Sequence, residues 1–301
     1  MNFLKEIENL KEVKNAIILA HYYQPGEIQE IADYVGDSYY LSKIAQQSPA
    51  QFIVFCGVEF MVESAKILSP DKRVFWGNTD SNCKMVDEFH DEELIELMEL
   101  HQDAAVVSYV NSSTRIKTMS YTCCTSSSAV PTVKSIENKK IIFVPDKNLG
   151  SYVAEQCPEK EIILGKGKCY VHDNVKAEEV LKLIELNPGA LVLTHPECQK
   201  EVRDISDYIG STGNILNYAI KSDKESFIIV TEMGITHILG KKCPEKKFYF
   251  PKMICGGMKR TTIEDVYRCL NYEENEILLP EDVIEKAALA LSNMIRLGEK
   301  R

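Results

Sequence analysis

The chain has 301 residues, enough for two or three domains with separate cores. Its composition is that of a globular protein, with 45% hydrophobic and 27% charged residues. The 35 Lys and Arg against 45 Asp and Glu give a formal net charge of −10, which argues against general binding to a phosphate backbone, so we expect no nucleic-acid partner.

The N-terminal segment predicts neither a secretion signal nor a membrane anchor. Residues 1–15 alternate charged and apolar side chains instead of forming an apolar core. No stretch approaches the roughly 18 uninterrupted apolar residues of a membrane span, so we expect no membrane partner. These features favour a cytoplasmic protein. In that reducing compartment, the ten cysteines should not form a disulfide framework.

An internal repeat of about 86 residues divides the chain into three copies. Each copy opens with an apolar run that predicts a strand buried on both faces of a parallel sheet. These runs lie at 15–23, 104–111 and 189–197. Ser-rich elements, where helices are expected to begin, follow at 35–45, 123–133 and 209–220. Second apolar runs follow at 51–57, 140–146 and 226–232, and a third strand ends each copy.

Chemically active side chains recur at equivalent points of the three copies. The first strands exit at His21, Tyr109 and His195, at intervals of 88 and 86 residues. The Ser-rich elements carry Ser38, Ser126 and Ser211, at intervals of 88 and 85. The third strands are expected to end at Cys83, Cys169 and Cys255, both intervals being 86. Because ligands bind beyond the carboxyl ends of parallel strands, we expect these residues to converge on one cavity.

The repeated βαβαβ pattern predicts an α/β protein. We expect three similar αβα domains with parallel sheets, arranged with pseudo-threefold symmetry around a central active site. The predicted domains are residues 1–83 together with C-terminal helices in 261–301, residues 84–169, and residues 170–260. The C-terminal helices, at 261–270 and 280–295, are expected to pack back on the first domain.

Three equivalent cysteines at one pole predict three thiolate ligands. Such a set fits a [4Fe–4S] cluster with one iron left open, and it also fits a zinc site with an open position. An open iron can act as a Lewis acid on a substrate oxygen. The other cysteines are interpreted as packing residues, with Cys198 near the site but not a ligand. These are Cys56, Cys123, Cys124, Cys157, Cys198, Cys243 and Cys269.

The remaining polar residues of the pattern predict an anionic substrate and proton transfer. Helix N-termini favour bound anions, so three symmetric helix starts suggest a small substrate with carboxylates, a phosphate or both. Tyr23 and Glu197 lie two residues beyond strand-exit histidines and offer a phenol and a carboxylate for acid–base work. Asn111, two residues beyond Tyr109, occupies the equivalent position in the second domain. His172 follows Cys169 closely enough to reach the same cavity.

The chain resembles the quinolinate synthase (NadA) family over nearly its whole length. Seven matching strings occur in family order, from AHYYQPGEIQEIADYVGDSYYLS near the N-terminus to MKRTT after the third predicted ligand. Between them lie SYVNSS with CCTSSSAV, C-x-VH at 169–172, LTHPEC, IGSTGNI and TEMGITHIL. One departure is CGGMK at 255–259, where the family more commonly has Cys-Pro-Asn-Met-Lys; its two glycines suggest a loosened loop carrying Met258.

The resemblance implies the reaction and the cofactor. It implies three αβα domains around one site and a [4Fe–4S] cluster held by Cys83, Cys169 and Cys255. It implies condensation of iminoaspartate with dihydroxyacetone phosphate to give quinolinate, phosphate and two waters in de novo NAD biosynthesis. L-aspartate oxidase, which makes iminoaspartate, is then the metabolic partner.

The resemblance also implies roles for the polar residues. Tyr23 and Glu197 are the expected acid–base pair, and the open iron would polarise the hydroxyl that leaves last. Expected orienting and hydrogen-bonding groups, some of them catalytic, are His21, Tyr109, Asn111, His172 and His195. Expected anion sites are Ser38, Ser126 and the Ser211–Thr212 pair.

Two other functional classes remain as alternatives. An iron–sulfur sensor or electron-transfer protein would need a fourth protein ligand or a DNA-reading element, and neither is evident in the sequence. A zinc-dependent enzyme acting on sugar phosphates would use the same three thiolates. Metal analysis of protein prepared without oxygen would separate the zinc enzyme from the iron–sulfur enzyme.

Overall fold

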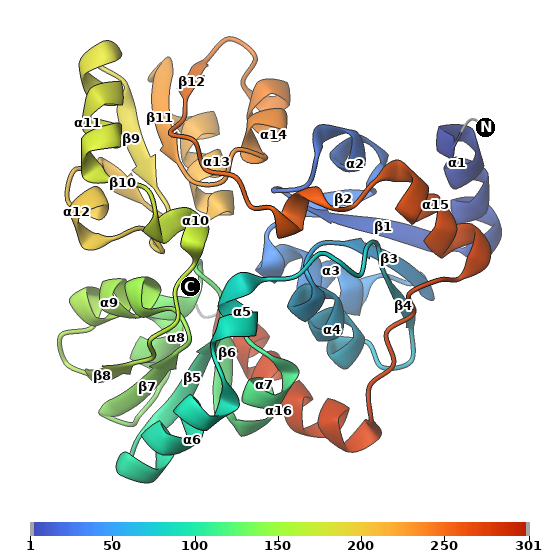
Figure 1. Cartoon of the computed structure of the whole chain (residues 1–301), viewed down its shortest axis with the longest axis horizontal. Coiled ribbons are helices and arrows are strands. Elements are labelled where there is room, and N and C mark those ends of the chain that lie inside the picture. The colour runs from blue at the N-terminus through green and yellow to red at the C-terminus, as the bar shows by residue number, and fades with distance from the viewer. Residues whose placement is uncertain (1–2, 299–301) are drawn as a thin grey trace.

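Three four-stranded parallel sheets form the framework of the molecule. The computed structural model describes residues 3–298 and arranges the three sheets around a common centre (Figure 1). Their strand orders are β2-β1-β3-β4, β6-β5-β7-β8 and β10-β9-β11-β12. Because each sheet repeats the same order, the predicted α/β class and the three similar αβα units are confirmed.

The first unit contains the strands β1 (Ala16–His21), β2 (Tyr34–Gly36), β3 (Phe52–Cys56) and β4 (Arg73–Trp76). Its helices are α1 (Phe3–Lys14), α2 (Gly26–Ile31), α3 (Ser38–Gln47) and α4 (Glu59–Leu68). All five residues of β3 are buried, as expected of a central strand covered by helices on both faces.

The second unit contains the strands β5 (Ala105–Tyr109), β6 (Thr122–Cys124), β7 (Lys140–Val144) and β8 (Glu161–Leu164). Its helices are α5 (Lys84–Glu88), α6 (Asp91–Leu100), α7 (Thr114–Met119), α8 (Ala129–Ser135) and α9 (Lys147–Gln156). The central β5 and β7 are apolar and almost entirely buried, which matches the continuous apolar runs of the sequence.

The third unit contains the strands β9 (Leu191–Thr194), β10 (Tyr208–Ile209), β11 (Ser226–Val230) and β12 (Lys247–Tyr249). Its helices are α10 (Tyr170–Asp173), α11 (Ala177–Leu186), α12 (Lys200–Arg203), α13 (Thr212–Lys221) and α14 (Ile235–Lys242), followed by the 3₁₀ turn η1 (Gly257–Lys259). The same strand–helix order therefore recurs a third time.

The predicted cysteine ligands lie beyond the third strands rather than at their ends. The strands β4, β8 and β12 stop at Trp76, Leu164 and Tyr249, and the cysteines follow seven, five and six residues later. Cys83 and Cys169 each directly precede a short helix, α5 and α10. Cys255 is separated from the 3₁₀ turn η1 by one residue, Gly256. The sequence therefore gave the correct interval between the cysteines but the wrong strand ends, because the polar residues between each strand and its cysteine form a loop.

The two C-terminal helices pack in different places. Helix α15 (Ile263–Tyr272) contacts α1 and β3 of the first unit, as expected. The backbone after it pairs antiparallel with β4, through Phe75 and Glu276. Helix α16 (Glu281–Gly298) instead lies between two units, against α4 on one side and α7, β6 and α8 on the other (Figure 1). The domain boundaries stay a prediction, and residues 299–301 lie outside the described part.

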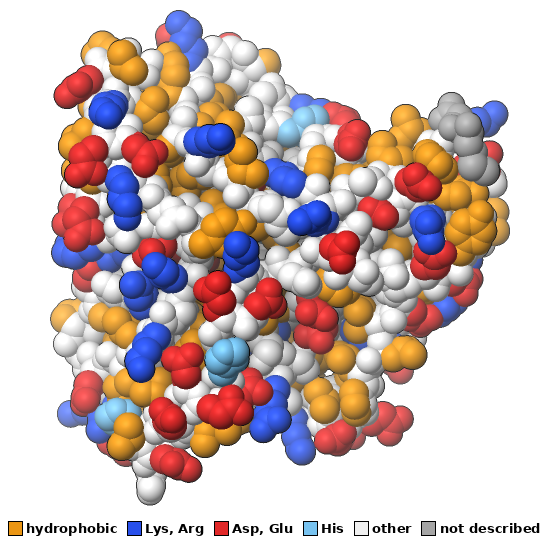
Figure 2. Space-filling model, in the orientation of Figure 1, with side chains coloured by type: hydrophobic (Ala, Val, Ile, Leu, Met, Phe, Trp, Pro, Cys, Tyr) orange, Lys and Arg blue, Asp and Glu red, His pale blue; other side chains and the backbone are white. Residues whose placement is uncertain are grey.

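Charges are mixed on the molecular surface. Asp and Glu side chains are interspersed with Lys and Arg on the face shown in Figure 2. Within residues 3–298, no helix is both long and apolar enough to cross a bilayer. Any binding of anions must therefore rely on local groups, because the net charge of −10 opposes it.

Replacing Leu291 by Ala should weaken the contact between the first two units. Leu291 is fully buried in α16, within the hydrophobic cluster that contains residues of both units. We expect the free energy of unfolding to fall by about 2–5 kcal/mol, through lost apolar burial and the cavity left behind. Urea unfolding followed by circular dichroism measures this change.

Leu289 on the same helix provides the matched control, because its side chain is 66% exposed. Leu289→Ala should change the free energy of unfolding by no more than about 0.5 kcal/mol. Equal losses in the two variants would contradict the packing of α16 described above.

Candidate active site

All three units contribute to one central cavity. It encloses about 680 Å³ of empty space, counting the part open to solvent, and this size is typical of small-molecule sites. Thirteen of the predicted site residues line it: His21, Tyr23, Ser38, Cys83, Tyr109, Asn111, Ser126, Cys169, His172, His195, Glu197, Thr212 and Cys255. The sequence repeat therefore brings together residues from distant parts of the chain.

Ser211 is the predicted residue that does not line the cavity. It is the N-cap of α13, and its hydroxyl forms a capping box with Asn214. Thr212, the first residue of the helix, faces the cavity instead. The hydroxyl of Ser211 serves the helix cap, and its expected role in substrate binding stays a prediction.

Backbone hydrogen bonds at three turns provide a second register for the repeat. The carbonyl oxygens of Asp37, Thr125 and Ser211 each accept the N–H four residues later, at 2.8–3.0 Å. Asp37 and Ser211 are helix N-caps, whereas Thr125 precedes the N-cap of α8, Ser128, by three residues. The residues that follow these three acceptors, Ser38, Ser126 and Thr212, line the cavity at intervals of 126 − 38 = 88 and 212 − 126 = 86. These intervals match those of the strand-exit residues, 88 and 86, whereas the predicted set Ser38, Ser126 and Ser211 has intervals of 88 and 85.

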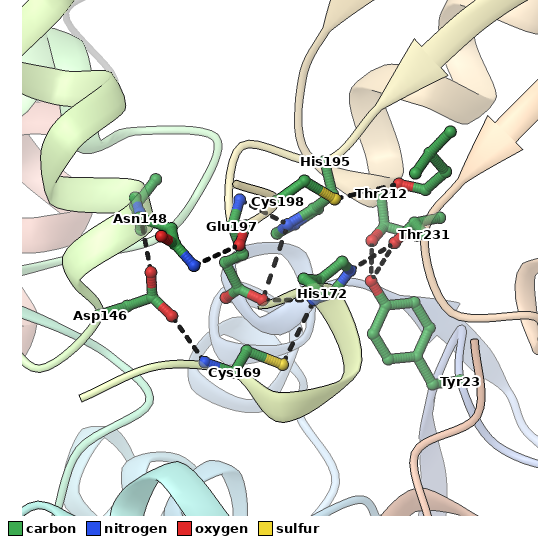
Figure 3. Close-up of polar contacts among 12 residues, drawn as sticks. Tyr23, Asp146, Asn148, Cys169, His172, His195, Glu197, Cys198, Thr212 and Thr231 are labelled. Atoms are coloured by element: carbon green, nitrogen blue, oxygen red, sulfur yellow. Dashed lines mark hydrogen bonds and ion pairs between the residues drawn. The ribbon is translucent and has the colours of Figure 1, made fainter. Parts of the chain in front are cut away.

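A chain of hydrogen bonds joins Tyr23 to Glu197 (Figure 3). The Tyr23 hydroxyl lies 2.8 Å from Oγ1 of Thr231, which lies 3.0 Å from Nε2 of His172. Nδ1 of His172 lies 2.7 Å from a carboxylate oxygen of Glu197. Thr212 also contacts the Tyr23 hydroxyl, at 2.6 Å. The two predicted acid–base residues are thus connected through Thr231 and His172.

One set of proton positions satisfies this chain. If Nδ1 of His172 donates to Glu197, then Nε2 accepts from the Thr231 hydroxyl, and Thr231 accepts from Tyr23. Each group is then both correctly protonated and hydrogen-bonded. A proton leaving Tyr23 can be matched by one arriving at Glu197.

Glu197 is the ionised acid at the centre of this network. Burial raises its pKa, but His195 and His172 outweigh burial and hold the pKa below its usual range. Its other carboxylate oxygen, Oε1, is buried and has no hydrogen-bond partner within residues 3–298. Oδ1 of Asn111 is in the same condition. Buried acceptors of this kind are normally paired, so both oxygens are available to a ligand.

The two strand-exit histidines are neutral. Burial lowers the pKa of His21 to about 3, helped by the charge of Lys259, and burial and His172 lower the pKa of His195 to about 3. Nδ1 of each ring accepts the backbone N–H two residues later, that of Tyr23 at 3.1 Å and that of Glu197 at 3.4 Å. The proton of each ring therefore sits on Nε2, where it can be donated.

The phenols of the cavity also keep their protons. Burial raises the pKa of Tyr23 well above its usual value, against the opposing hydrogen bonds of Thr212 and Thr231. Burial and the Glu197 charge raise the pKa of Tyr109 in the same direction. The cavity thus offers protonated phenols and neutral imidazoles around the ionised Glu197, and the carboxyl groups of Asp37 and Glu232 also line it.

The three cysteines share a local geometry that suits a metal centre. Burial raises the pKa of each thiol, to about 12 for Cys83. A hydrogen bond from a backbone N–H three residues later opposes this effect and lowers the pKa of each thiol. The donors are the N–H groups of Val86 for Cys83, His172 for Cys169 and Met258 for Cys255. A bound metal would supply the positive charge that buried thiolates need. Three half-buried sulfurs on one cavity fit an iron–sulfur cluster with an open iron.

A second metal arrangement is possible at the same place. One ligand atom from each of Cys169, His172 and Glu197 lies within 4.8 Å of the other two. A sulfur, an imidazole and a carboxylate with an open position are typical of zinc sites. The geometry therefore does not choose between a cluster and a single ion. It places both candidate ligand sets on the same cavity.

The other seven cysteines are buried free thiols, and they do not line the cavity. Cys198 packs with its sulfur 3.9 Å from the carbonyl oxygen of Val230, next to the site but outside it. Gly257, which the sequence suggested as a loosening residue, has a packing role. A Cβ there would lie 2.1 Å from the carbonyl oxygen of Asn82, so glycine permits this close approach.

The sequence analysis missed several residues in or next to the cavity: Glu232 lines it, and Thr231 and Asp146 bond to residues that do. Thr231 follows the central strand β11, but the equivalent positions carry Gly57 and Pro145, so the repeat gave no polar signal there. The next position carries Val58, Asp146 and Glu232, and the intervals of 88 and 86 could have revealed the two acids. Phe60 and Met258 also line the cavity, but apolar residues are ordinary in such a sequence.

The comparisons with known proteins agree with this geometry. The sequence model of the family described as quinolinate synthetase A protein, NadA, matches residues 5–296. A quinolinate synthase from Clostridium perfringens strain 13 is 52% identical over 300 residues, covering 99% of this chain and all of that protein. One from Clostridioides difficile strain 630 is 50% identical over 296 residues, covering 98% of this chain and 97% of that protein. The chain therefore belongs to the quinolinate synthetase A family of enzymes.

Proposed function

We propose that the protein is a quinolinate synthase of de novo NAD biosynthesis. It would condense iminoaspartate with dihydroxyacetone phosphate to give quinolinate, phosphate and two waters. The observation that carries this proposal is the single cavity on which three repeat-related cysteines and the Tyr23–Glu197 network meet. An L-aspartate oxidase would supply the iminoaspartate, and both enzymes would work in the cytoplasm.

The proposed cofactor is a [4Fe–4S] cluster held by Cys83, Cys169 and Cys255. An iron without a protein ligand supplies Lewis-acid chemistry to a substrate oxygen when the cluster is bound. The protein provides three thiols and the backbone N–H groups that face them. Such N–H groups stabilise the anionic form of sulfur, which favours a thiolate-bound metal.

The anionic groups of the substrates would bind at the three helix starts. Ser38, Ser126 and Thr212 each offer a hydroxyl beside backbone N–H groups at the beginning of a helical turn. Two carboxylates and one phosphate require three such positions. At the third position, Ser211 of the predicted Ser211–Thr212 pair caps the helix, and Thr212 lines the cavity.

The proton transfers would use Tyr23 and Glu197. Glu197 is ionised and has a free oxygen, so it can accept a proton from the carbon that forms the new bond. Tyr23 keeps its proton and can donate it to a leaving or carbonyl oxygen. The Thr231–His172 link lets the two residues exchange a proton between half-reactions without bulk water.

The neutral side chains would orient the substrates. His21 and His195 carry their protons on Nε2, and Tyr109 keeps its phenol proton, so each donates a hydrogen bond without adding charge. Asn111 has a buried amide oxygen with no partner among residues 3–298 and can accept from an imine or amine N–H. These groups would hold the reacting atoms in line with Glu197.

The test of the proposed function is an assay under anaerobic conditions. Protein loaded with iron and sulfide should form quinolinate from iminoaspartate and dihydroxyacetone phosphate. Metal and sulfide analysis of the same sample tests the alternative zinc site at Cys169, His172 and Glu197. Active protein with one zinc and no sulfide would replace the cluster by that site, and inactive loaded protein would overturn the reaction.

Replacing any one of Cys83, Cys169 or Cys255 by Ala should prevent stable cluster binding. Each replacement removes one of three thiolates, which leaves another iron without a protein ligand. The measurement is visible absorbance, with iron and sulfide counted per chain after anaerobic reconstitution. Cys157→Ala is the control, because Cys157 is buried outside the cavity and should leave the absorbance intact. A stable cluster in all three variants would contradict the ligand set.

Glu197→Gln should abolish turnover and leave the cluster in place. The amide keeps the size of the side chain but cannot act as a base, so we expect a loss of roughly 10²–10⁴-fold in kcat. The assay is quinolinate formation under anaerobic conditions, with the absorbance spectrum recorded on the same sample. Full activity of this variant would show that another group accepts the proton.

Thr231→Val should slow proton exchange between Tyr23 and Glu197. Valine has the shape of threonine but removes the hydroxyl that bridges Tyr23 and His172. We expect a fall of roughly 10–100-fold in kcat with little change in KM, because a proton relay acts on the chemical steps. Steady-state kinetics with varied dihydroxyacetone phosphate separates the two parameters.

Thr194→Val is the matched control for that variant. Thr194 is equally buried in the third unit, but its hydroxyl bonds to Ser206 at 2.6 Å and does not line the cavity. Its kcat should stay near that of the unaltered enzyme. If both variants lose activity alike, buried hydroxyls in this unit matter for packing and the relay is not needed.

A further inference from the structure

Two buried carboxylates occupy equivalent positions next to predicted cysteine ligands, and one of them, Glu232, also lines the cavity. The second residue beyond the central strand of each unit is Val58, Asp146 or Glu232, at intervals of 146 − 58 = 88 and 232 − 146 = 86. Asp146 and Glu232 are both 0% exposed. A buried carboxylate is costly unless it is hydrogen-bonded, so the partners of these two acids indicate their role.

Each carboxylate binds the backbone N–H of a predicted cysteine ligand. One oxygen of Asp146 accepts the N–H of Cys169 at 2.9 Å, and Figure 3 shows this contact. One oxygen of Glu232 accepts the N–H of Cys255 at 3.1 Å. The two cysteines come from different units, so the same contact occurs twice independently.

The second oxygen of each acid anchors the carboxylate to its own unit. In Asp146 it accepts the N–H of Leu149 at 2.7 Å and caps α9. In Glu232 it accepts the N–H of Gly234 at 2.7 Å, just before α14. Each acid therefore connects the backbone near the start of the next helix, α9 or α14, to the backbone of a cysteine. Within residues 3–298, Glu232 but not Asp146 also forms an ion pair, because Nζ of Lys259 lies 3.0 and 3.1 Å from the two oxygens of Glu232.

A backbone contact common to all three units provides the reference. In each unit, the residue after Val58, Asp146 or Glu232 donates its backbone N–H to a carbonyl oxygen in the loop that precedes the cysteine. The N–H of Glu59 binds the carbonyl oxygen of Ser81 at 3.2 Å, and that of Lys147 binds the carbonyl oxygen of Gly167 at 2.9 Å. The third such bond joins Met233 to Met253, also at 2.9 Å. All three units thus share this backbone hydrogen bond, and two of them also have the bond from the cysteine N–H to a carboxylate. In the first unit Val58 has no acceptor to offer Cys83.

We propose that Asp146 and Glu232 are positioning residues that hold Cys169 and Cys255 for the metal centre. The inference rests on the proposed binding of a cluster by these cysteines. A hydrogen bond to the N–H of a ligand residue restricts its backbone, and so fixes the direction of its Cβ–Sγ bond. Outer-shell partners of this kind determine how long a metal stays bound as much as the ligands do.

The test compares Asp146→Asn and Glu232→Gln with the unaltered protein. Asparagine caps a helix as well as aspartate does, so Asp146→Asn keeps the α9 cap and turns an NH₂ group toward the Cys169 N–H. Glutamine at 232 similarly loses one of its two acceptors. Asp146→Ser is a second variant, because serine also caps helices but is too short to reach Cys169.

Asp207→Ala serves as the control. Asp207 accepts the N–H of Val192 at 2.8 Å in the third unit, so the control removes a similar bond without touching a cysteine. Metal-free samples of all variants are first compared by thermal unfolding. The positioning variants should melt no lower than the control, since the cysteine contact serves the metal.

The main readout is release of iron from the anaerobically reconstituted protein to a bathophenanthroline chelator. The Asp146 and Glu232 variants should release iron roughly 10–100-fold faster than the unaltered protein, and Asp207→Ala within about twofold of it. Iodoacetamide labelling during release, mapped by mass spectrometry, locates the change. Cys169 should be labelled earliest in the Asp146 variants and Cys255 earliest in Glu232→Gln.

The outcomes separate this inference from the proposed function. Unaltered protein that assembles no iron–sulfur centre overturns this inference and the proposed cluster, whereas the proposed reaction is tested separately by the anaerobic assay. Unaltered protein that binds the cluster, with variants that release iron at the same rate, overturns the positioning role alone. Faster release with the same cysteine labelled in every variant also overturns it, because general destabilisation would have that effect.

Discussion

The site depends on three parallel sheets that direct the carboxyl ends of their strands to one centre. No single unit can form the cavity, because its lining alternates between residues of all three. Parallel sheets are covered by helices on both faces, so their chemistry is confined to the ends of the strands. Helix α16, packed between the first two units, adds apolar contacts that hold two of these ends in place.

The electrostatics of the cavity follow from burial. Desolvation keeps His21, His195, Tyr23 and Tyr109 neutral, and the contact with Nδ1 of His172 helps keep Glu197 charged. The cavity therefore combines neutral hydrogen-bond donors with the carboxyl groups of Asp37, Glu197 and Glu232, so any anion it binds must rely on local donors and helix starts. Three thiols with raised pKa values need a cation nearby, which is the role we propose for the cluster.

The sequence predicted the fold and most of the cavity because the repeat has a nearly constant length. Residues placed by strand exits, such as His21, Tyr109 and His195, needed only the correct interval. At Ser211 and Thr212, adjacent residues both suit a helix start, and hydrogen-bond geometry is needed to distinguish the cap from the residue that lines the cavity. Thr231 was missed because its equivalents, Gly57 and Pro145, lack a hydroxyl, and the position of α16 depends on tertiary packing that periodicity does not encode.

The copies share a backbone plan but differ at each functional position. Two residues beyond the predicted strand exits at 21, 109 and 195 stand Tyr23, Asn111 and Glu197, which are a phenol, an amide and a carboxylate. A symmetric scaffold therefore surrounds the cavity with unlike groups. The backbone hydrogen bond to the loop before the cysteine persists in all three units, whereas the bond from the cysteine N–H to a carboxylate occurs in two. Constraints on folding thus preserve the repeat, and constraints on chemistry break it at the residues that face the cavity or support its ligands.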